Sequence, residues 1–190
     1  EMLLNMHAND LIFVDKIGIL NLDNTQSESK RQSVIVRCTN KQLTGDLTHA
    51  LKKADVFIGV SAGNILNVDM LSLMNENAIV FAMANPVPEV MPDVAKAAHV
   101  AVIGTGRSDF PNQINNLLAF PGVFKGALMS RAKTINETMK IAAVDALASL
   151  VSDNELSSDF IIPSVFDQRV VVKVSEAVVK AAYETNVAQK

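Results

Sequence analysis

The sequence is poor in the features that mark secreted and membrane proteins. Its only cysteine, Cys38, has no partner within the chain, so no internal disulfide can form. Apolar runs such as residues 79–84 are far shorter than the roughly 20 residues that a helix needs to span a bilayer. The chain does not open with a charged leader followed by an apolar stretch and a cleavage site. We therefore expect a cytoplasmic protein that has no membrane partner.

Charged residues are also scarce, at 19% of the chain, and they form no block of one sign. Lys and Arg number 17 against 20 Asp and Glu, so the net charge is −3 and nucleic acid is not an expected partner. The three histidines, His7, His49 and His99, are far apart in the sequence. No two carboxylates have convincing spacing for an oxygen-rich metal site, so we expect no metal ligands in this chain.

The sequence is rich in apolar residues, 49% of the chain, arranged in an alternation of two patterns. Short apolar runs typical of strands occur at residues 11–15, 56–60, 78–83 and 100–104. Helical patterns occur at residues 27–38, 44–53, 69–75, 92–98, 134–152 and 169–185. Because the runs are apolar on both faces, they suit a parallel sheet covered by helices on each side. The predicted fold is α/β, a doubly wound parallel sheet of the Rossmann type followed by C-terminal helices.

No repeat, low-complexity tract or linker divides the chain. We therefore predict one dinucleotide-binding domain over residues 1–190, with residues 160–190 as a C-terminal helical segment. Residues 1–7 read as the end of an amphipathic helix that has no start signal. We expect this domain to be partial and the sequence to belong to a longer chain.

The first predicted strand ends in Asp15. In dinucleotide folds an acidic residue at the end of the second strand accepts hydrogen bonds from the ribose hydroxyls of the adenosine. The matching glycine loop lies about 20 residues earlier, which places it and the first strand before residue 1. An Asp at a strand end is otherwise a turn former or a helix cap, and that alternative stays open. If Asp15 binds the ribose it favours NAD, although the neighbouring Lys16 could turn toward the 2′-phosphate of NADP.

Two further segments follow predicted strands at the edge where such sheets bind ligands. Ser61 and Ala62 stand among small residues after the second run, where short side chains permit close approach of a cofactor. Asn85 follows the third run, and Pro86 disfavours a helical conformation for it, so its amide could point into a cleft. Ordinary connecting turns have the same composition, so these signals need further support.

Residues 105–122 differ from an ordinary loop. Carboxamides, two prolines and an Arg/Asp pair follow a core strand, and burying such groups is unfavourable unless they find partners. Embedded apolar residues, among them Phe110, Ile114 and Phe120, argue against disorder. We interpret this segment as functional. Asp109 beside Arg107 is interpreted as an ion pair that holds the loop, in preference to a metal ligand.

These segments carry a resemblance to a known family. Residues 82–86 (AMANP), 105–116 (TGRSDFPNQINN) and 120–127 (FPGVFKGA) resemble the malic enzymes in their smaller, bacterial-type form. Residues 135–143 (INETMKIAA) and 161–167 (IIPSVFD) are also similar, so the resemblance covers nearly the whole chain. The asparagine-rich stretch is its most specific part.

The resemblance implies oxidative decarboxylation of malate to pyruvate and CO2 with reduction of NAD or NADP. It matches Asn85 and Asn116 to asparagines that contact the nicotinamide and the malate, and it places Asn115 beside them in the cofactor site. Mg²⁺ or Mn²⁺, its carboxylate ligands, a lysine base and a tyrosine acid are implied upstream, so no catalytic residue is assigned in this chain.

The resemblance also implies a homodimer in the complete enzyme. Two alternatives stay open. One is a malolactic or oxaloacetate-decarboxylating relative, and the other is a nucleotide-binding module without catalysis.

Overall fold

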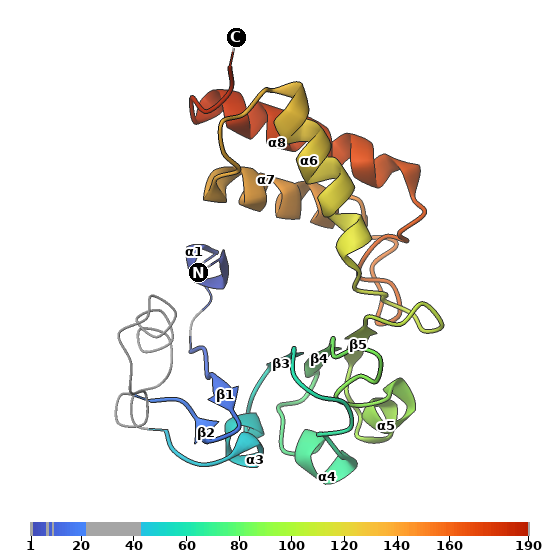
Figure 1. The fold of residues 1–190 in the computed structure, drawn as a ribbon. Coiled ribbons are helices and arrows are strands. Elements are labelled where there is room, and N and C mark those ends of the chain that lie inside the picture. Colours follow the sequence, from blue (N-terminus) through green and yellow to red (C-terminus); the bar gives the residue numbers. More distant parts are fainter. Residues whose placement is uncertain (1, 7, 9, 22–42, 190) are drawn as a thin grey trace.

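The computed structural model describes residues 2–6, 8, 10–21 and 43–189 (Figure 1). Its centre is a three-stranded parallel sheet in the order β3-β4-β5, formed by β3 (Val56–Gly59), β4 (Ile79–Ala82) and β5 (Val102–Thr105). Val56 pairs with Ile79 and Ile79 pairs with Val102, so the three strands begin and end in register. The predicted α/β fold with a parallel sheet is confirmed.

Short helices connect these strands. α4 (Val68–Leu71) joins β3 to β4, α5 (Pro92–Ala97) joins β4 to β5, and α3 (Leu47–Leu51) precedes the sheet. Asp46 and Asn67 cap α3 and α4 through side-chain oxygens that accept backbone N–H groups, and α5 starts at a proline. The predicted helix at residues 27–38 lies outside the described residues.

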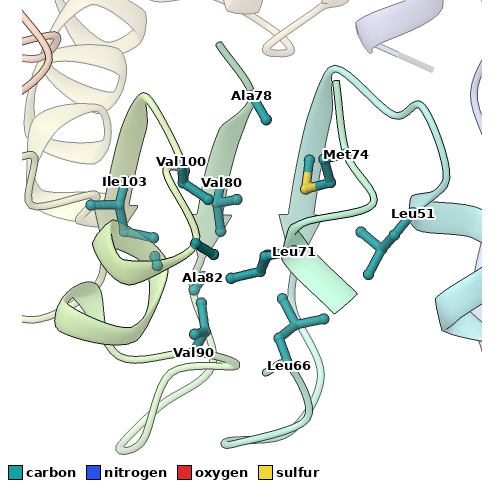
Figure 2. Close-up of a cluster of buried hydrophobic side chains, with 12 residues drawn as sticks. Leu51, Leu66, Leu71, Met74, Ala78, Val80, Ala82, Val90, Val100 and Ile103 are labelled. Atoms are coloured by element: carbon teal, nitrogen blue, oxygen red, sulfur yellow. The ribbon is translucent and has the colours of Figure 1, made fainter. Parts of the chain in front are cut away.

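The first cluster of buried side chains joins these helices to the sheet (Figure 2). Val80 and Ala82 of β4 are fully buried against residues such as Leu71 of α4 and Ala95 of α5. On the other side of β3, Val56 and Ile58 are 46% and 45% exposed. Among the described residues, helices therefore cover β3 on only one side, where the sequence predicted both.

Residues 11–15 were predicted to form a strand of the parallel sheet, and this prediction is wrong. Only β1 (Val14–Asp15) is extended there, and it pairs antiparallel with β2 (Gly18–Ile19) in a separate two-stranded sheet. Gly18 has a φ of +105°, and a Cβ there would clash with the backbone oxygen of Gly45. The conformation of this glycine suits a tight hairpin, in which Val14 and Asp15 pair with β2 and not with the parallel sheet.

Three longer helices form a second cluster: α6 (Phe120–Met129), α7 (Glu137–Ala148) and α8 (Gln168–Glu184). Gly122 and Gly126 of α6 lie against α8, and a Cβ on Gly126 would lie 2.7 Å from both the Ser175 oxygen and the Val178 Cβ. The helical part thus starts near residue 120, well before the predicted segment at 160–190. The buried residues of the described chain fall into two clusters. One domain over residues 1–190 stays a prediction.

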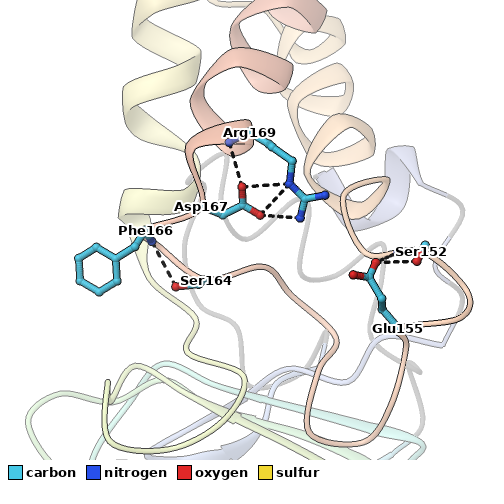
Figure 3. A network of polar contacts seen from close by, with 6 residues as sticks. All are labelled: Ser152, Glu155, Ser164, Phe166, Asp167 and Arg169. Atoms are coloured by element: carbon cyan, nitrogen blue, oxygen red, sulfur yellow. Dashed lines mark hydrogen bonds and ion pairs between the residues drawn. The ribbon is translucent and has the colours of Figure 1, made fainter.

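The start of α8 is held by a polar network (Figure 3). The carboxylate of Asp167 accepts the backbone N–H of Arg169 at 2.9 Å and pairs with its guanidinium at 2.7 Å. The hydrogen bonds from the Arg169 side chain and backbone lower the pKa of Asp167. Glu155 nearby accepts both the hydroxyl and the backbone N–H of Ser152.

Asn112 connects the two parts of the chain. It is buried, and its side-chain amide donates to the carbonyl oxygens of Ile103 at 3.0 Å and Ser158 at 2.8 Å. Its oxygen accepts the N–H of Ile161 at 2.9 Å. A Lys96–Asp159 ion pair, at 3.5 Å, lies between α5 and the same loop. None of the helices in the described part of the chain is long and apolar enough to cross a membrane.

Candidate functional site: a pocket at the carboxyl edge of the sheet

A pocket opens where β4 and β5 end. It has a volume of about 430 Å³, and its lining comes from two loops: Ala84, Asn85, Pro86, Gly106, Arg107, Ser108, Asp109 and Gln113. Parallel α/β sheets bind their ligands at this edge, because the loops after the strands diverge there. The pocket therefore lies at the edge where this kind of fold binds ligands, and Asn85 lines it, while the role of Asn85 in binding stays a prediction.

An ion pair shapes one wall of the pocket. The Arg107 Nε and Nη2 atoms donate to the two oxygens of Asp109 at 2.9 and 2.6 Å, and the guanidinium lies 5.5 Å from the centre of the Phe110 ring. The hydrogen bonds with Arg107 lower the pKa of Asp109. The predicted ion pair is confirmed. The sequence did not assign Arg107, Ser108 or Gln113 to a binding site.

Gly106 stands between β5 and this ion pair and has open space where a side chain would project. Outside the adjacent residues Thr105 and Arg107, the nearest heavy atom to a Cβ built there is the Ile114 backbone oxygen at 3.9 Å. Gly104, two residues earlier, is packed closely, since its Cβ would lie 2.8 Å from Ile114 Cδ1. The wall of the pocket at residue 106 is therefore free of side-chain atoms.

The loops after β3 and β4 are tied together by a buried carboxyl group. Glu89 is 0% exposed, and its two oxygens accept the backbone N–H groups of Ser61 at 2.8 Å and Ala84 at 2.9 Å. Ser61 and Ala62 are themselves exposed and do not line the pocket. Glu89 was not recognised from the sequence, because its hydrogen-bond partners are up to 28 residues away.

Asn115 and Asn116 follow the pocket loop in the sequence and lie at the start of the short helix η1 (Asn116–Leu118). The Asn115 side chain caps η1 by accepting the N–H of Leu117 at 3.0 Å. The Asn116 side chain is exposed and makes no hydrogen bond with the described residues. Neither residue lines the pocket that contains Asn85, so the structure does not bring the three predicted asparagines into one cavity.

Asp15 lies in the β1–β2 hairpin, and its carboxylate accepts the backbone N–H of Lys16 at 2.6 Å. The prediction of a ribose contact assumed a residue at the end of a parallel strand, and this premise is not met. Asp15 lies in a hairpin, and its contact with the ribose stays a prediction. Among the described residues, no three His, Cys, Asp or Glu side chains group together in a way that could hold a metal ion.

A parallel β-α-β-α-β unit with a polar pocket at its carboxyl edge defines a nucleotide-binding domain of the Rossmann type. Residues 4–183 match the family described as malic enzyme, NAD binding domain. The chain belongs to this family.

Known relatives agree with this assignment. The chain is 49% identical over 183 residues to a bifunctional malic/malolactic enzyme from Bacillus subtilis, covering 96% of this chain and 45% of that protein. It is 48% identical over 190 residues to an NAD-dependent malic enzyme from Geobacillus stearothermophilus, covering 100% of this chain and 40% of that protein. NADP-dependent malic enzymes are also among the relatives.

Solved structures show the same fold. The malic enzyme of Entamoeba histolytica superposes with a TM-score of 0.92 at 34% identity, covering 98% of this chain and 40% of that chain. The chain thus spans less than half the length of each of these three proteins.

Proposed function

We propose that the protein is a malic enzyme and that this chain forms its nucleotide-binding part. The reaction is malate + NAD⁺ → pyruvate + CO2 + NADH. A hydride passes from the carbon of malate that bears the hydroxyl group to the nicotinamide. The observation that carries the proposal is the position of Asn85 in a pocket at the carboxyl edge of a parallel sheet, in a chain of the malic enzyme family.

The proposed roles of the asparagines follow from the chemistry of the carboxamide. Asn85 and Asn116 orient malate and the nicotinamide, and Asn115 lies beside them in the cofactor site. A carboxamide both donates and accepts hydrogen bonds and does not titrate, so it can hold the reactants without competing for their protons. These residues position the reactants and are neither the acid nor the base.

NAD is the proposed cofactor, with NADP as the alternative. The exposed Asp15 would accept the ribose hydroxyls and repel a 2′-phosphate, whereas Lys16 could approach that phosphate. Ser61 and Ala62 would approach the cofactor from the loop after β3. Both kinds of cofactor dependence occur among the relatives.

Mg²⁺ or Mn²⁺ belongs to the proposed activity, but the described residues do not fit a site for it, since they offer no group of three metal-binding side chains. We therefore derive no step of the reaction through the metal. Its ligands, the acid and the base are proposed to come from another part of the protein. A homodimer and a cytoplasmic location are further predictions.

A malolactic activity is the second candidate, because one relative is named a bifunctional malic/malolactic enzyme. That reaction converts malate and a proton to lactate and CO2 with no net reduction of NAD. Product analysis of the full-length protein separates the two: pyruvate with an equal amount of NADH supports the malic reaction, and lactate without NADH supports the other.

The pocket itself is tested by filling it. In the full-length protein, Gly106→Ala and Gly106→Val place side chains of increasing size in open space at the wall of the pocket. Crowding of the ligand should raise the KM for NAD stepwise, by about tenfold or more for valine, with little change in the melting temperature Tm.

Gly104→Ala is the contrasting variant, because its Cβ would lie 2.8 Å from Ile114 Cδ1, so it should lower Tm. An unchanged KM for NAD in both Gly106 variants would show that the cofactor binds elsewhere. A wild-type protein that neither binds NAD or NADP nor converts malate would overturn the proposed function as a whole.

A further inference from the structure

Glu89 is a buried carboxyl group that no step of the proposed reaction uses. Its exposed fraction is 0%, and none of the salt bridges found among the described residues includes it. Burying a carboxyl group is costly unless its oxygens find donors, and a hydrophobic residue of similar size would avoid that cost. Its presence therefore needs a reason other than filling space.

The hydrogen bonds of Glu89 supply that reason. One oxygen accepts the N–H of Ser61, which follows β3 two residues after its last residue, and the other accepts the N–H of Ala84, which follows β4. The Ser61 hydroxyl lies 3.5 Å from the first oxygen. One side chain thus holds the starts of two neighbouring loops at the ligand-binding edge of the sheet.

The backbone around Glu89 adds two more connections between the same loops. The N–H of Asn64 donates to the Pro88 oxygen at 2.9 Å, and the N–H of Leu66 donates to the Glu89 oxygen at 3.0 Å. Gly59, the last residue of β3, leaves room for the carboxyl group, since a Cβ there would lie 2.6 Å from Glu89 Oε1. The sequence thus provides both the carboxyl group and the space that it occupies.

We propose that Glu89 is a positioning residue for the cofactor site, an inference that rests on the proposed function. It sets the separation between Ser61 and Ala62 on one loop and Asn85 on the other, which are the proposed cofactor contacts. It acts through the backbone and does not itself touch the cofactor. Loss of one of its two acceptors would let the loops shift and would weaken NAD binding.

The test uses Glu89→Gln in the full-length protein, because glutamine has the same shape but replaces one acceptor oxygen by an NH2 group that only donates. One of the two backbone N–H groups then has no acceptor. The dissociation constant for NADH, measured by fluorescence, and the KM for NAD should each rise by about tenfold. The kcat at saturating NAD should change less than the KM.

The matched control is Leu51→Ala, which removes a side chain of α3 that is buried in the first cluster and makes none of these loop contacts. It should lower Tm while the KM for NAD stays within about twofold of the wild-type value. A Glu89→Gln protein with a lowered Tm and an unchanged KM would overturn the inference, because Glu89 would then only stabilise the fold.

Glu89→Asp keeps the test decisive if the glutamine variant does not fold. Aspartate has both oxygens but is one methylene shorter, so it should raise the KM for NAD above the wild-type value by less than about tenfold. An unchanged KM in Glu89→Asp with a lowered Tm would likewise overturn the inference. If the wild-type protein does not bind NADH, the proposed function fails first, and that result is distinct from failure of the role of Glu89.

Discussion

Asparagines of the segment after β5 serve three different purposes. Asn112 is buried and uses both ends of its amide within the protein, and Asn115 caps η1. Asn116 is exposed and bonds to none of the described residues. An amide that the fold does not use is available to a ligand, so Asn116 is the residue at which a functional effect separates best from a structural one.

Asn116→Ala in the full-length protein should therefore reduce turnover without reducing stability. Loss of one positioning contact at the reacting centre can lower the rate on the order of a hundredfold, and we expect a fall in kcat of that size. Tm should stay close to the wild-type value, because no hydrogen bond of the fold is lost. The control is Asn154→Ala, an exposed asparagine in another loop, which should alter neither quantity. Steady-state kinetics with malate would decide, and a wild-type kcat would contradict the role.

At the scale of single elements, α6 shows how packing overrides local preference. Its sequence contains Pro121 near the start and glycines at 122 and 126, and residues 105–122 were interpreted as a functional loop, so the sequence did not predict this helix. Proline suits a first helical turn, and the two glycines allow α8 to approach closely. The approach of α8 could not be read from the sequence of α6 alone.

Gly126→Ala should destabilise the protein although alanine favours helices by about 1 kcal/mol over glycine. The added Cβ would overlap the Ser175 oxygen and the Val178 Cβ, and overpacking of this kind costs about 1–3 kcal/mol. Tm of the full-length protein should fall. Met129→Ala, at a residue on α6 that is 60% exposed, should leave Tm nearly unchanged. A higher Tm for Gly126→Ala would show that α6 and α8 are less closely packed than the structure indicates.

The other elements were predictable to different degrees. The strands at 56–60, 78–83 and 100–104 and the helix at 169–185 lie within a few residues of β3, β4, β5 and α8, because apolar runs and helical periodicity are local signals. Residues 11–15 gave a similar apolar signal but form a hairpin, because strand pairing depends on distant residues and on the turn at Gly18. From its position after a strand, Asn85 could be expected at the carboxyl edge of the sheet, where it lines a pocket. Glu89 could not be recognised, because its hydrogen bonds form only in the folded chain.

At the level of the whole molecule, Asn112 contributes three hydrogen bonds between the sheet and the segment that leads to the second cluster of buried side chains. Its three hydrogen bonds join the end region of β5 to residues 158–161, which lead toward α8. The residue has a φ of +54°, a left-handed conformation that asparagine tolerates better than most residues. Both its backbone and its side chain therefore favour asparagine at this position.

Asn112→Gly keeps the backbone conformation and removes the three hydrogen bonds. We expect a loss of about 2–4 kcal/mol in the free energy of unfolding, since each bond contributes about 1 kcal/mol and buried partners are left unpaired. In hydrogen-exchange mass spectrometry of the full-length protein, peptides containing Ile161 should exchange faster, while the centre of α8 stays protected.

The control for the glycine itself is Asn77→Gly, at an exposed residue with a φ of +60°. It should leave exchange near residue 161 unchanged. Unaltered exchange in Asn112→Gly would show that other contacts hold the loop.

Because a side chain at residue 106 would project into open space, substitutions of Gly106 should affect protein abundance and activity differently. A screen that scores cellular abundance would pass larger residues there, because nothing in the folded chain resists them, whereas a screen that scores growth on malate would reject them. Substitutions at Gly104, two residues earlier, would be rejected by both screens, because a Cβ there would lie 2.8 Å from Ile114 Cδ1 and 3.2 Å from the Asn112 backbone oxygen. The two glycines, separated by a single residue, would thus have different mutational profiles, one set by the ligand and the other by folding.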